Sequence, residues 1–152
     1  MPDPEACRVA LERIVGDWEG QESLHPAPYN PLGGTALGRS RNRLVLDGFA
    51  VIEDYEHLPR GQVSYRRHSV TSYDSSEKQY LRYQWDSMGN SASAFRGRFD
   101  GDVLTMTYEE PGLTARQVMD YSDPERLTLL MQVSRQGAPF ETILEAEYLR
   151  QA

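Results

Sequence analysis

The chain has 152 residues, of which 39% are hydrophobic and 26% are charged. This balance is typical of a globular protein rather than a disordered chain, and we expect one domain over residues 1–152 with a sizeable core. The net charge of -7 argues against nucleic acid and anionic lipid as partners, because both attract clustered lysine and arginine.

Cys7 is the single cysteine, so no internal disulfide can form, and a reducing compartment is favoured. The N-terminus is acidic and lacks a long apolar run, so we expect neither a signal peptide nor insertion into a membrane. We therefore expect a cytoplasmic protein.

The N-terminal segment, residues 1–15, is predicted to form a short α-helix. Asp3 is a suitable N-cap for it. Cys7, Leu11 and Ile14 fall on one helical stripe, so we expect them to pack against apolar side chains. Such a helix could plug one end of a β-barrel.

Residues 16–150 alternate with a period of two along most of their length, which predicts β-strands. Short links with turn chemistry, such as Asp47-Gly48 and Asp100-Gly101, separate them, and residues 25–34 form the one long irregular link. A meander of this many antiparallel strands closes, because closure removes exposed sheet edges. We predict an all-β fold, a single antiparallel meander barrel of about ten strands, at residues 17–24, 35–46, 49–58, 62–73, 79–86, 91–99, 103–109, 114–121, 126–134 and 140–149.

The alternation also predicts which side chains line the interior. In the strand at 79–86 the apolar set is Leu81, Tyr83 and Trp85, which we place inside, with Arg82 in the opposite polar set. The same reasoning predicts a lining rich in aromatic residues and methionine. Its further members are Leu104, Met106, Tyr108, Gln117, Met119, Tyr121, Leu127, Leu129, Met131, Val133, Phe140, Leu144 and Tyr148.

Two carboxylates fall on faces that are predicted to point inward. Glu53 shares a face with Val51 and Tyr55, and Glu22 shares one with Trp18. An enclosed carboxylate needs a hydrogen-bonding partner or a raised pKa.

The basic residues of the second strand, Arg39, Arg41 and Arg43, alternate onto one face. We interpret them as a solvated stripe that pairs with acidic neighbours. An arginine of this stripe that pointed inward could instead clamp a ligand carboxylate.

Neither metal ligands nor catalytic residues are predicted. The histidines, His25, His57 and His68, lack the spacings of metal sites. His68 lies in mid-strand, where it would either titrate in a cavity or form a hydrogen bond on the barrel wall. Asp86-Ser87 lacks the surroundings of a catalytic nucleophile, so we expect both side chains to bind backbone groups at a strand end.

Several strings of residues carry a family resemblance. They are Gly16-Asp17-Trp18-Glu19-Gly20, Gly33-Gly34-Thr35-Ala36, Leu46-Asp47-Gly48-Phe49, Asp54-Tyr55-Glu56, Tyr83-Gln84-Trp85-Asp86-Ser87-Met88-Gly89 and Glu145-Ala146-Glu147-Tyr148-Leu149-Arg150. The chain resembles domain-of-unknown-function family 1579, small bacterial β-barrel proteins within the wider calycin or lipocalin-like group. The resemblance implies a barrel and no agreed activity.

In lipocalins the tryptophan of such a Gly-x-Trp string closes one barrel end, which implies that role for Trp18. The chain departs from the family around His68, where Arg67 and Ser69 stand in place of flanking glycines. A more distant similarity links it to nitrobindin-type haem barrels. Their haem-ligating histidine lies late in the chain, whereas no histidine follows His68 here, so we predict no cofactor.

Our leading hypothesis is a non-enzymatic barrel that binds a small hydrophobic or amphipathic molecule, with a homodimer left open. The predicted lining is Trp18, Tyr55, Tyr83, Trp85, Met106 and Met119, with His68 or Glu53 as a polar anchor. One alternative is an isomerase or hydrolase that uses an enclosed carboxylate or histidine as general base. The other is a structural or partner-binding barrel with a filled core.

Overall fold

The computed structural model describes residues 4–27 and 30–152. The predicted N-cap Asp3, and residues 28–29 of the long link, lie outside the described residues. The elements in chain order are α1 (Pro4–Leu11), β1 (Gly16–Leu24), β2 (Gly34–Val45), the 3-10 turn η1 (Leu46–Gly48), β3 (Ala50–Leu58), the 3-10 turn η2 (Pro59–Gly61), β4 (Tyr65–Asp74), β5 (Gln79–Asp86), β6 (Ser93–Asp100), β7 (Val103–Glu110), β8 (Leu113–Asp123), β9 (Arg126–Arg135) and β10 (Glu141–Arg150).

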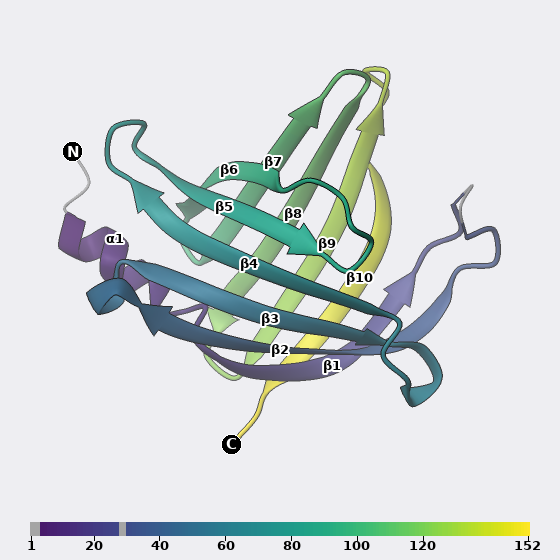
Figure 1. Cartoon of the computed structure of the whole chain (residues 1–152), viewed down its shortest axis with the longest axis horizontal. Helices are drawn as coiled ribbons and strands as arrows, with labels where there is room; N and C mark the ends of the chain where they lie inside the picture. The colour runs from purple at the N-terminus through teal and green to yellow at the C-terminus, as the bar shows by residue number, and fades with distance from the viewer. Residues whose placement is uncertain (1–3, 28–29) are drawn as a thin grey trace.

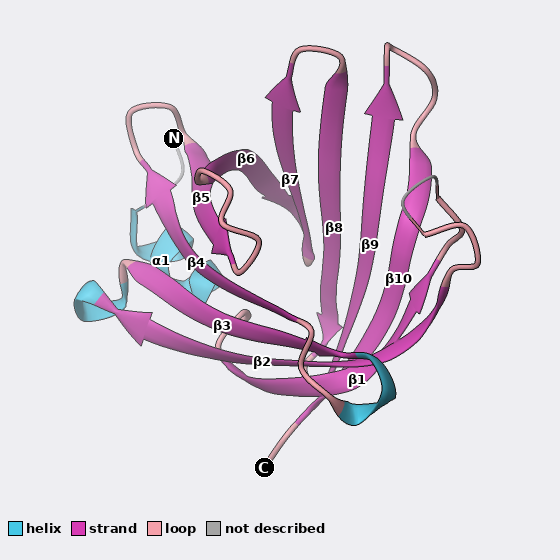
Figure 2. Cartoon of the chain, turned by 45° about the vertical axis from the view of Figure 1, so that its right-hand side comes forward, coloured by secondary structure: helices cyan, strands magenta, loops and turns pink. Residues whose placement is uncertain are grey.

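The strands form a closed antiparallel barrel in which each strand pairs with its neighbours in sequence and β1 pairs with β10 (Figure 1). The meander and the ten strands predicted from alternation are confirmed. Figure 2 shows the same barrel from a second side, with α1 lying at one end, beside the start of β3 and the end of β4. No helix in the described part of the chain is long and apolar enough to cross a membrane.

The helix α1 closes one end of the barrel. Cys7, Leu11 and Ile14 are buried in the main apolar cluster, as the helical stripe predicted. The Tyr80 hydroxyl on β5 donates a hydrogen bond to the Cys7 carbonyl at 3.1 Å. The helix is shorter than the predicted segment, because after Leu11 the backbone tightens into turns, with Ile14 N–H bonded to Leu11 O at 3.1 Å.

Trp18 lies at this closed end, as the resemblance implied. Its side chain is buried, and its Nε1 donates to the carbonyl of Ile14 at 3.1 Å. The Arg150 guanidinium lies over the indole ring, 4.3 Å from the ring centroid to Cζ. The first and last strands are therefore joined at the barrel floor by a stacked cation as well as by their ladder.

Several inward side chains far from α1 are less buried than those beside it, although Ala36 and Val133 at the far end are also buried. Inward side chains near the helix, such as Leu104 and Met106, are fully buried. Toward the opposite end the inward residues His57, Tyr65 and Met131 are only half-buried. The barrel is thus closed at the α1 end and open at the end where β3 runs into β4 and β9 into β10.

The predicted orientation of β5 is wrong. Tyr83 and Trp85 project outward and are 43% and 45% exposed, whereas Arg82 is inside and 7% exposed. The physical reason is that the interior next to β5 is polar, with Thr71 and Gln117 bonding Arg82. The apolar set of the strand was therefore not the inward set.

The predicted inward orientation of Phe140 is also wrong. Phe140 precedes β10 and is exposed, with the Arg116 guanidinium over its ring at 3.7 Å. A register shift between Thr142 and Leu144 breaks the alternation of β10. The residues beyond it, Leu144 and Tyr148, keep the predicted inward direction, since both pack in or against the core.

Candidate functional site

A groove of about 800 Å³ lies on the outer face of the barrel. On β1 to β4 its lining runs over three successive residues, of which the outer two project outward and the middle one points inward. The backbones of these strands therefore form the floor. The outward residues of the lining are Asp17, Glu19, Arg39, Arg41, Asp54, Glu56, Arg66, His68 and Trp85.

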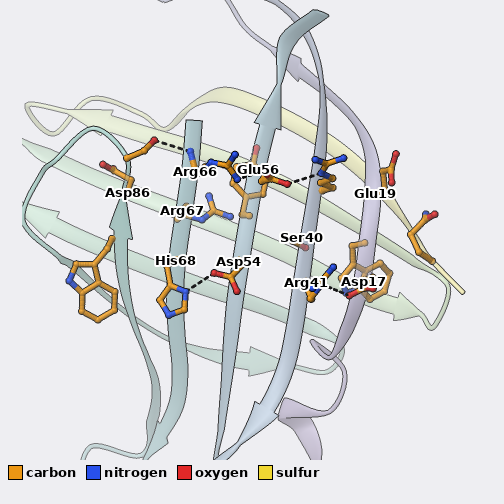
Figure 3. Close-up of a pocket in the computed structure, with 16 residues that line it drawn as sticks. Asp17, Glu19, Ser40, Arg41, Asp54, Glu56, Arg66, Arg67, His68 and Asp86 are labelled. Carbon is orange, nitrogen blue, oxygen red and sulfur yellow. Dashed lines mark hydrogen bonds and ion pairs between the residues drawn. The ribbon is translucent and has the colours of Figure 1, made fainter. Parts of the chain in front are cut away.

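Eight of these residues form a charge ladder across β1 to β4 (Figure 3). One row is Asp17, Arg41, Asp54 and His68, and the second is Glu19, Arg39, Glu56 and Arg66, each residue opposite the next in the register. Acid and base alternate from strand to strand in both rows, so cross-strand neighbours attract. Arg39 Nε lies 2.8 Å from Glu56 Oε1, and His68 Nδ1 lies 2.8 Å from Asp54 Oδ1.

The predicted solvated basic stripe is confirmed. Arg39, Arg41 and Arg43 are all exposed, and they pair with Glu56, Asp17 and Asp54. Because most charges of the groove are paired and all its outward side chains are solvated, they contribute little to holding a ligand.

His68 and two of the predicted lining aromatics belong to this outer face. His68 and Tyr83 each lie 6.4 Å from Trp85 between ring centroids. Ser87 and Asp86 end the strand as predicted, because Ser87 Oγ accepts from Arg66 N–H and Asp86 Oδ1 accepts from Met88 N–H, both at 2.9 Å.

Inside the barrel, Glu22 is the centre of a buried hydrogen-bond cluster. Tyr55 donates its hydroxyl to Glu22 Oε2 at 2.5 Å, and Tyr148 donates to the same oxygen. His57 Nδ1 lies 2.6 Å from Oε1. Glu22 is fully buried, as its predicted inward direction requires. Burial and the adjacent carboxylate raise the pKa of Tyr148 well above its usual value, so both hydroxyls stay protonated donors.

Gly38 makes room for this cluster. A Cβ at position 38 would overlap the carboxylate of Glu22. Glycine is therefore required on β2 by the close approach of a charged side chain from β1, and not by an unusual backbone angle.

A second interior cluster contains three charged side chains. Arg67 donates to Glu53 Oε1 from Nε at 3.2 Å and from Nη2 at 3.0 Å, and its guanidinium lies 4.1 Å from the ring centroid of Tyr55. Arg82 donates from Nε to Thr71 at 2.7 Å and from Nη1 to Gln117 at 2.8 Å. Burial alone would raise the pKa of Glu53, but the two guanidinium groups hold it below its usual value.

These charges surround a small interior cavity of about 30 Å³. Glu53, Arg67 and Arg82 form its polar side, and the rest is mostly apolar and aromatic. The apolar and aromatic lining is Tyr55, Met119, Tyr121, Leu127, Leu129, Met131 and Tyr148. The space is sufficient for about one water-sized group.

The structure thus divides the predicted site residues among three places. Glu53, Tyr55 and Met119 line the interior cavity, Trp18 and Met106 are packed at the closed end, and His68, Tyr83 and Trp85 project from the outer face. No described side chains form a group of three or more histidine, cysteine or acidic residues that could hold a metal ion.

Sequence reasoning missed Arg67 and Arg82 as interior groups. The available signal was Tyr80, a large aromatic residue with the same parity as Arg82 on β5. Tyr80 alone favoured an inward direction for its face, whereas three apolar residues favoured the opposite face. No comparable signal marks Arg67, which stands in a run of charged residues.

The fold and its interior define a class of closed ten-stranded antiparallel β-barrels that carry charged groups inside. The chain belongs to the family described as Protein of unknown function (DUF1579), whose model matches residues 3–150. None of the curated proteins compared with the chain matches it.

Two solved structures are similar to this barrel. Rv2717c from M. tuberculosis has a TM-score of 0.67 at 15% identity, over 96% of this chain and 98% of that one. The S-type phycobiliprotein lyase CPES from Guillardia theta has a TM-score of 0.59 at 15% identity, over 93% of this chain and 90% of that one. At this identity the likeness concerns the fold.

Proposed function

We propose that the protein binds a small amphipathic molecule inside the barrel, with entry from the open end. The observation that carries this proposal is the presence of Glu53, Arg67 and Arg82 in the interior. Burying charged groups costs free energy that apolar side chains of similar size would avoid. A barrel packed for stability alone has no need of them, whereas a ligand-binding interior does.

The lining supports an amphipathic ligand rather than a wholly polar one. Met119, Leu129 and Met131 form an apolar wall opposite the charged groups. Methionine side chains adapt their shape readily, so this wall can accommodate a chain or ring. The existing cavity of about 30 Å³ would receive one end of the molecule, and the remainder would extend along the half-buried residues toward the open end.

The similarity of this barrel to the phycobiliprotein lyase structure supports a ligand-binding barrel. The proposal rests on the charged interior described above.

Native mass spectrometry of the purified protein, compared with its denatured mass, tests for a carried ligand. We expect a discrete excess mass under native conditions. Titration with the uncharged fluorophore N-phenyl-1-naphthylamine tests whether the interior admits an apolar molecule. Met131→Trp fills the cavity and should abolish its binding, whereas Leu130→Trp, which changes the outward neighbour on β9, should not. A bare native mass together with no binding of the fluorophore to the wild-type protein would contradict the proposal.

A second candidate function is general-base catalysis by His57. Nδ1 of His57 lies 2.6 Å from Oε1 of Glu22, so the carboxylate orients the imidazole through this nitrogen and leaves Nε2 as its other ring nitrogen. Among the described residues Nε2 has no hydrogen-bond partner, and the side chain is 16% exposed. A histidine oriented by a carboxylate with one free nitrogen has the arrangement of a general base.

Hydrolysis of p-nitrophenyl esters provides the test for this second candidate. His57→Gln should lower the rate at least tenfold if His57 is the base. His68→Gln is the matched control, because His68 also pairs with a carboxylate but lies on the outer face. Equal rates for wild type and His57→Gln would exclude the candidate for this reaction class.

A further inference from the structure

Arg82 is a buried cation that uses only part of its hydrogen-bonding capacity. Its Nε donates to Thr71, and its Nη1 donates to Gln117 and lies 3.4 Å from the Met119 sulfur. Nη2 has no partner among the described residues. Every fully buried side-chain nitrogen and oxygen of these residues is hydrogen-bonded, so Nη2 must border the open space of the cavity that Arg82 lines.

Two guanidinium groups and one carboxylate lie on the described lining of the cavity, while the carboxylate of Glu22 lies behind it, bonded to the hydroxyls of Tyr55 and Tyr148. Glu53 is the one carboxylate on its lining, against the two guanidinium groups of Arg67 and Arg82. The bonds of Glu53 to the arginines go to Arg67 alone, through Oε1. Burial lowers the pKa of Arg82, whereas the pKa of Arg67 is raised by Glu53 in spite of its burial. One positive charge therefore remains without a directly bonded counter-charge.

The unsatisfied donors define the group that would complete the site. Nη2 of Arg82 and Nη1 of Arg67 have no hydrogen-bond partner among the described residues, so they can donate to an anion. A planar carboxylate accepts hydrogen bonds from guanidinium groups in the geometry they prefer. A phosphate dianion is less suitable, because it is bulkier than a carboxylate and would place two negative charges beside Glu53.

We propose that the ligand is a monocarboxylate amphipath whose carboxylate is bound at depth by Arg82, with Arg67 beside it, while its apolar part lies along Met119, Leu129 and Met131. This proposal rests on the proposed function and specifies its ligand class. Arg82 would then be the residue that distinguishes an acid from an uncharged molecule of the same shape, because it contributes a charge that only the acid neutralises.

Isothermal titration calorimetry with hexanoate, decanoate and the corresponding primary amides tests the proposal. We expect the wild-type protein to bind an acid at least tenfold more tightly than its amide. Arg82→Gln keeps a polar side chain facing Thr71 and Gln117. It should weaken binding of the acid at least tenfold and change binding of the amide by less than about threefold. Arg116→Gln is the matched control, since Arg116 donates to Gln132 on the outer face, and it should change neither.

Glu53→Gln provides a second variant that does not depend on removing Arg82. It deletes the competing negative charge of the cavity, so binding of the acid should tighten several-fold while binding of the amide stays the same. Near-ultraviolet circular dichroism confirms that each variant is folded.

The outcomes separate the two proposals. Equal affinity of acid and amide for the wild type, with no effect of Arg82→Gln, would overturn the carboxylate site and leave interior binding in place. Failure of acid, amide and the uncharged fluorophore to bind the wild type would overturn both.

Discussion

At the scale of single residues, the Glu22 cluster joins strands that are far apart in the chain. Glu22 accepts bonds from Tyr55 on β3 and Tyr148 on β10, and contacts His57. Each partner is buried or half-buried, so the loss of one would leave a desolvated polar group without a partner. The cluster is possible because Gly38 leaves the space that the carboxylate occupies.

Gly38→Ala should destabilise the protein by about 2 kcal/mol, because the added methyl group overpacks the cluster and displaces a buried carboxylate. The free energy of unfolding in urea measures this. The same substitution made in a Glu22→Ala background should cost less, because the overlapping group has been removed. An equal cost in both backgrounds would show that the backbone of β2, and not Glu22, requires glycine.

The lowered pKa of Glu53 predicts a specific loss of stability in acid. Its pKa in the folded protein lies below the usual 4.5, so the stability that its charge contributes is complete above about pH 4.5 and is lost as the pH falls through the folded-state pKa. Glu53→Gln should therefore be less stable than the wild type at pH 7, with a difference that narrows below about pH 4.5.

Urea unfolding at pH 7, 5, 4 and 3 gives the comparison. Glu77→Gln in the exposed β4–β5 turn is the control and should follow the wild type throughout. A constant difference between the wild type and Glu53→Gln at all four values would contradict the assignment of a lowered pKa.

The side chains of β5 show where residue-level prediction from sequence fails. Alternation correctly separated Leu81, Tyr83 and Trp85 from Arg82 and its neighbours, but it placed the wrong set inside. Alternation separates the two faces of a strand, but it does not show which face points into the barrel. The direction depends on Gln117, 35 residues away in the chain, which accepts the hydrogen bond of Arg82.

At the scale of elements, β1 to β4 are held in register on their outer face by the charge ladder. Each row alternates acid and base over four strands. A slip of one residue would turn the ladder toward the interior and the apolar side chains outward. The ladder thus favours the same register as the interior packing.

Glu56→Lys should destabilise the protein by about 1 kcal/mol, because Glu56 lies between Arg39 and Arg66 and the new charge would repel both. High salt should reduce the effect, since the ladder is solvent-exposed. Urea unfolding at low and high ionic strength measures it, with Glu77→Lys as the control. An effect that salt does not change would indicate a packing defect instead.

At the scale of the whole molecule, the barrel depends on the contact between its two termini. β1 pairs with β10 over seven residue pairs, from Trp18 with Arg150 to Leu24 with Leu144. The helix α1 then covers the end where Trp18 lies. Because closure involves the first and the last strand, we expect the complete chain to unfold as one unit, in line with the predicted single domain.

The two tryptophans allow a direct test of cooperative unfolding. Trp18 lies buried at the closed end and Trp85 is exposed on the outer face. The Trp85→Phe and Trp18→Phe proteins each keep one reporter, and in each the fluorescence and far-ultraviolet circular dichroism transitions should coincide. Separate midpoints within one variant would show that part of the barrel unfolds independently. Acrylamide should quench Trp85 and not Trp18.

The sequence by itself determined the strands, the turns, the meander and the inward direction of Glu22 and Glu53. These features depend on alternation and turn residues, which act between neighbours in the chain. The tertiary structure alone decided that Arg82 lies inside, that Trp85 lies outside and that the interior is nearly filled. These features depend on partners brought together only when the barrel closes, because the free energy of a buried charge is set by the groups across the interior and not by its own strand.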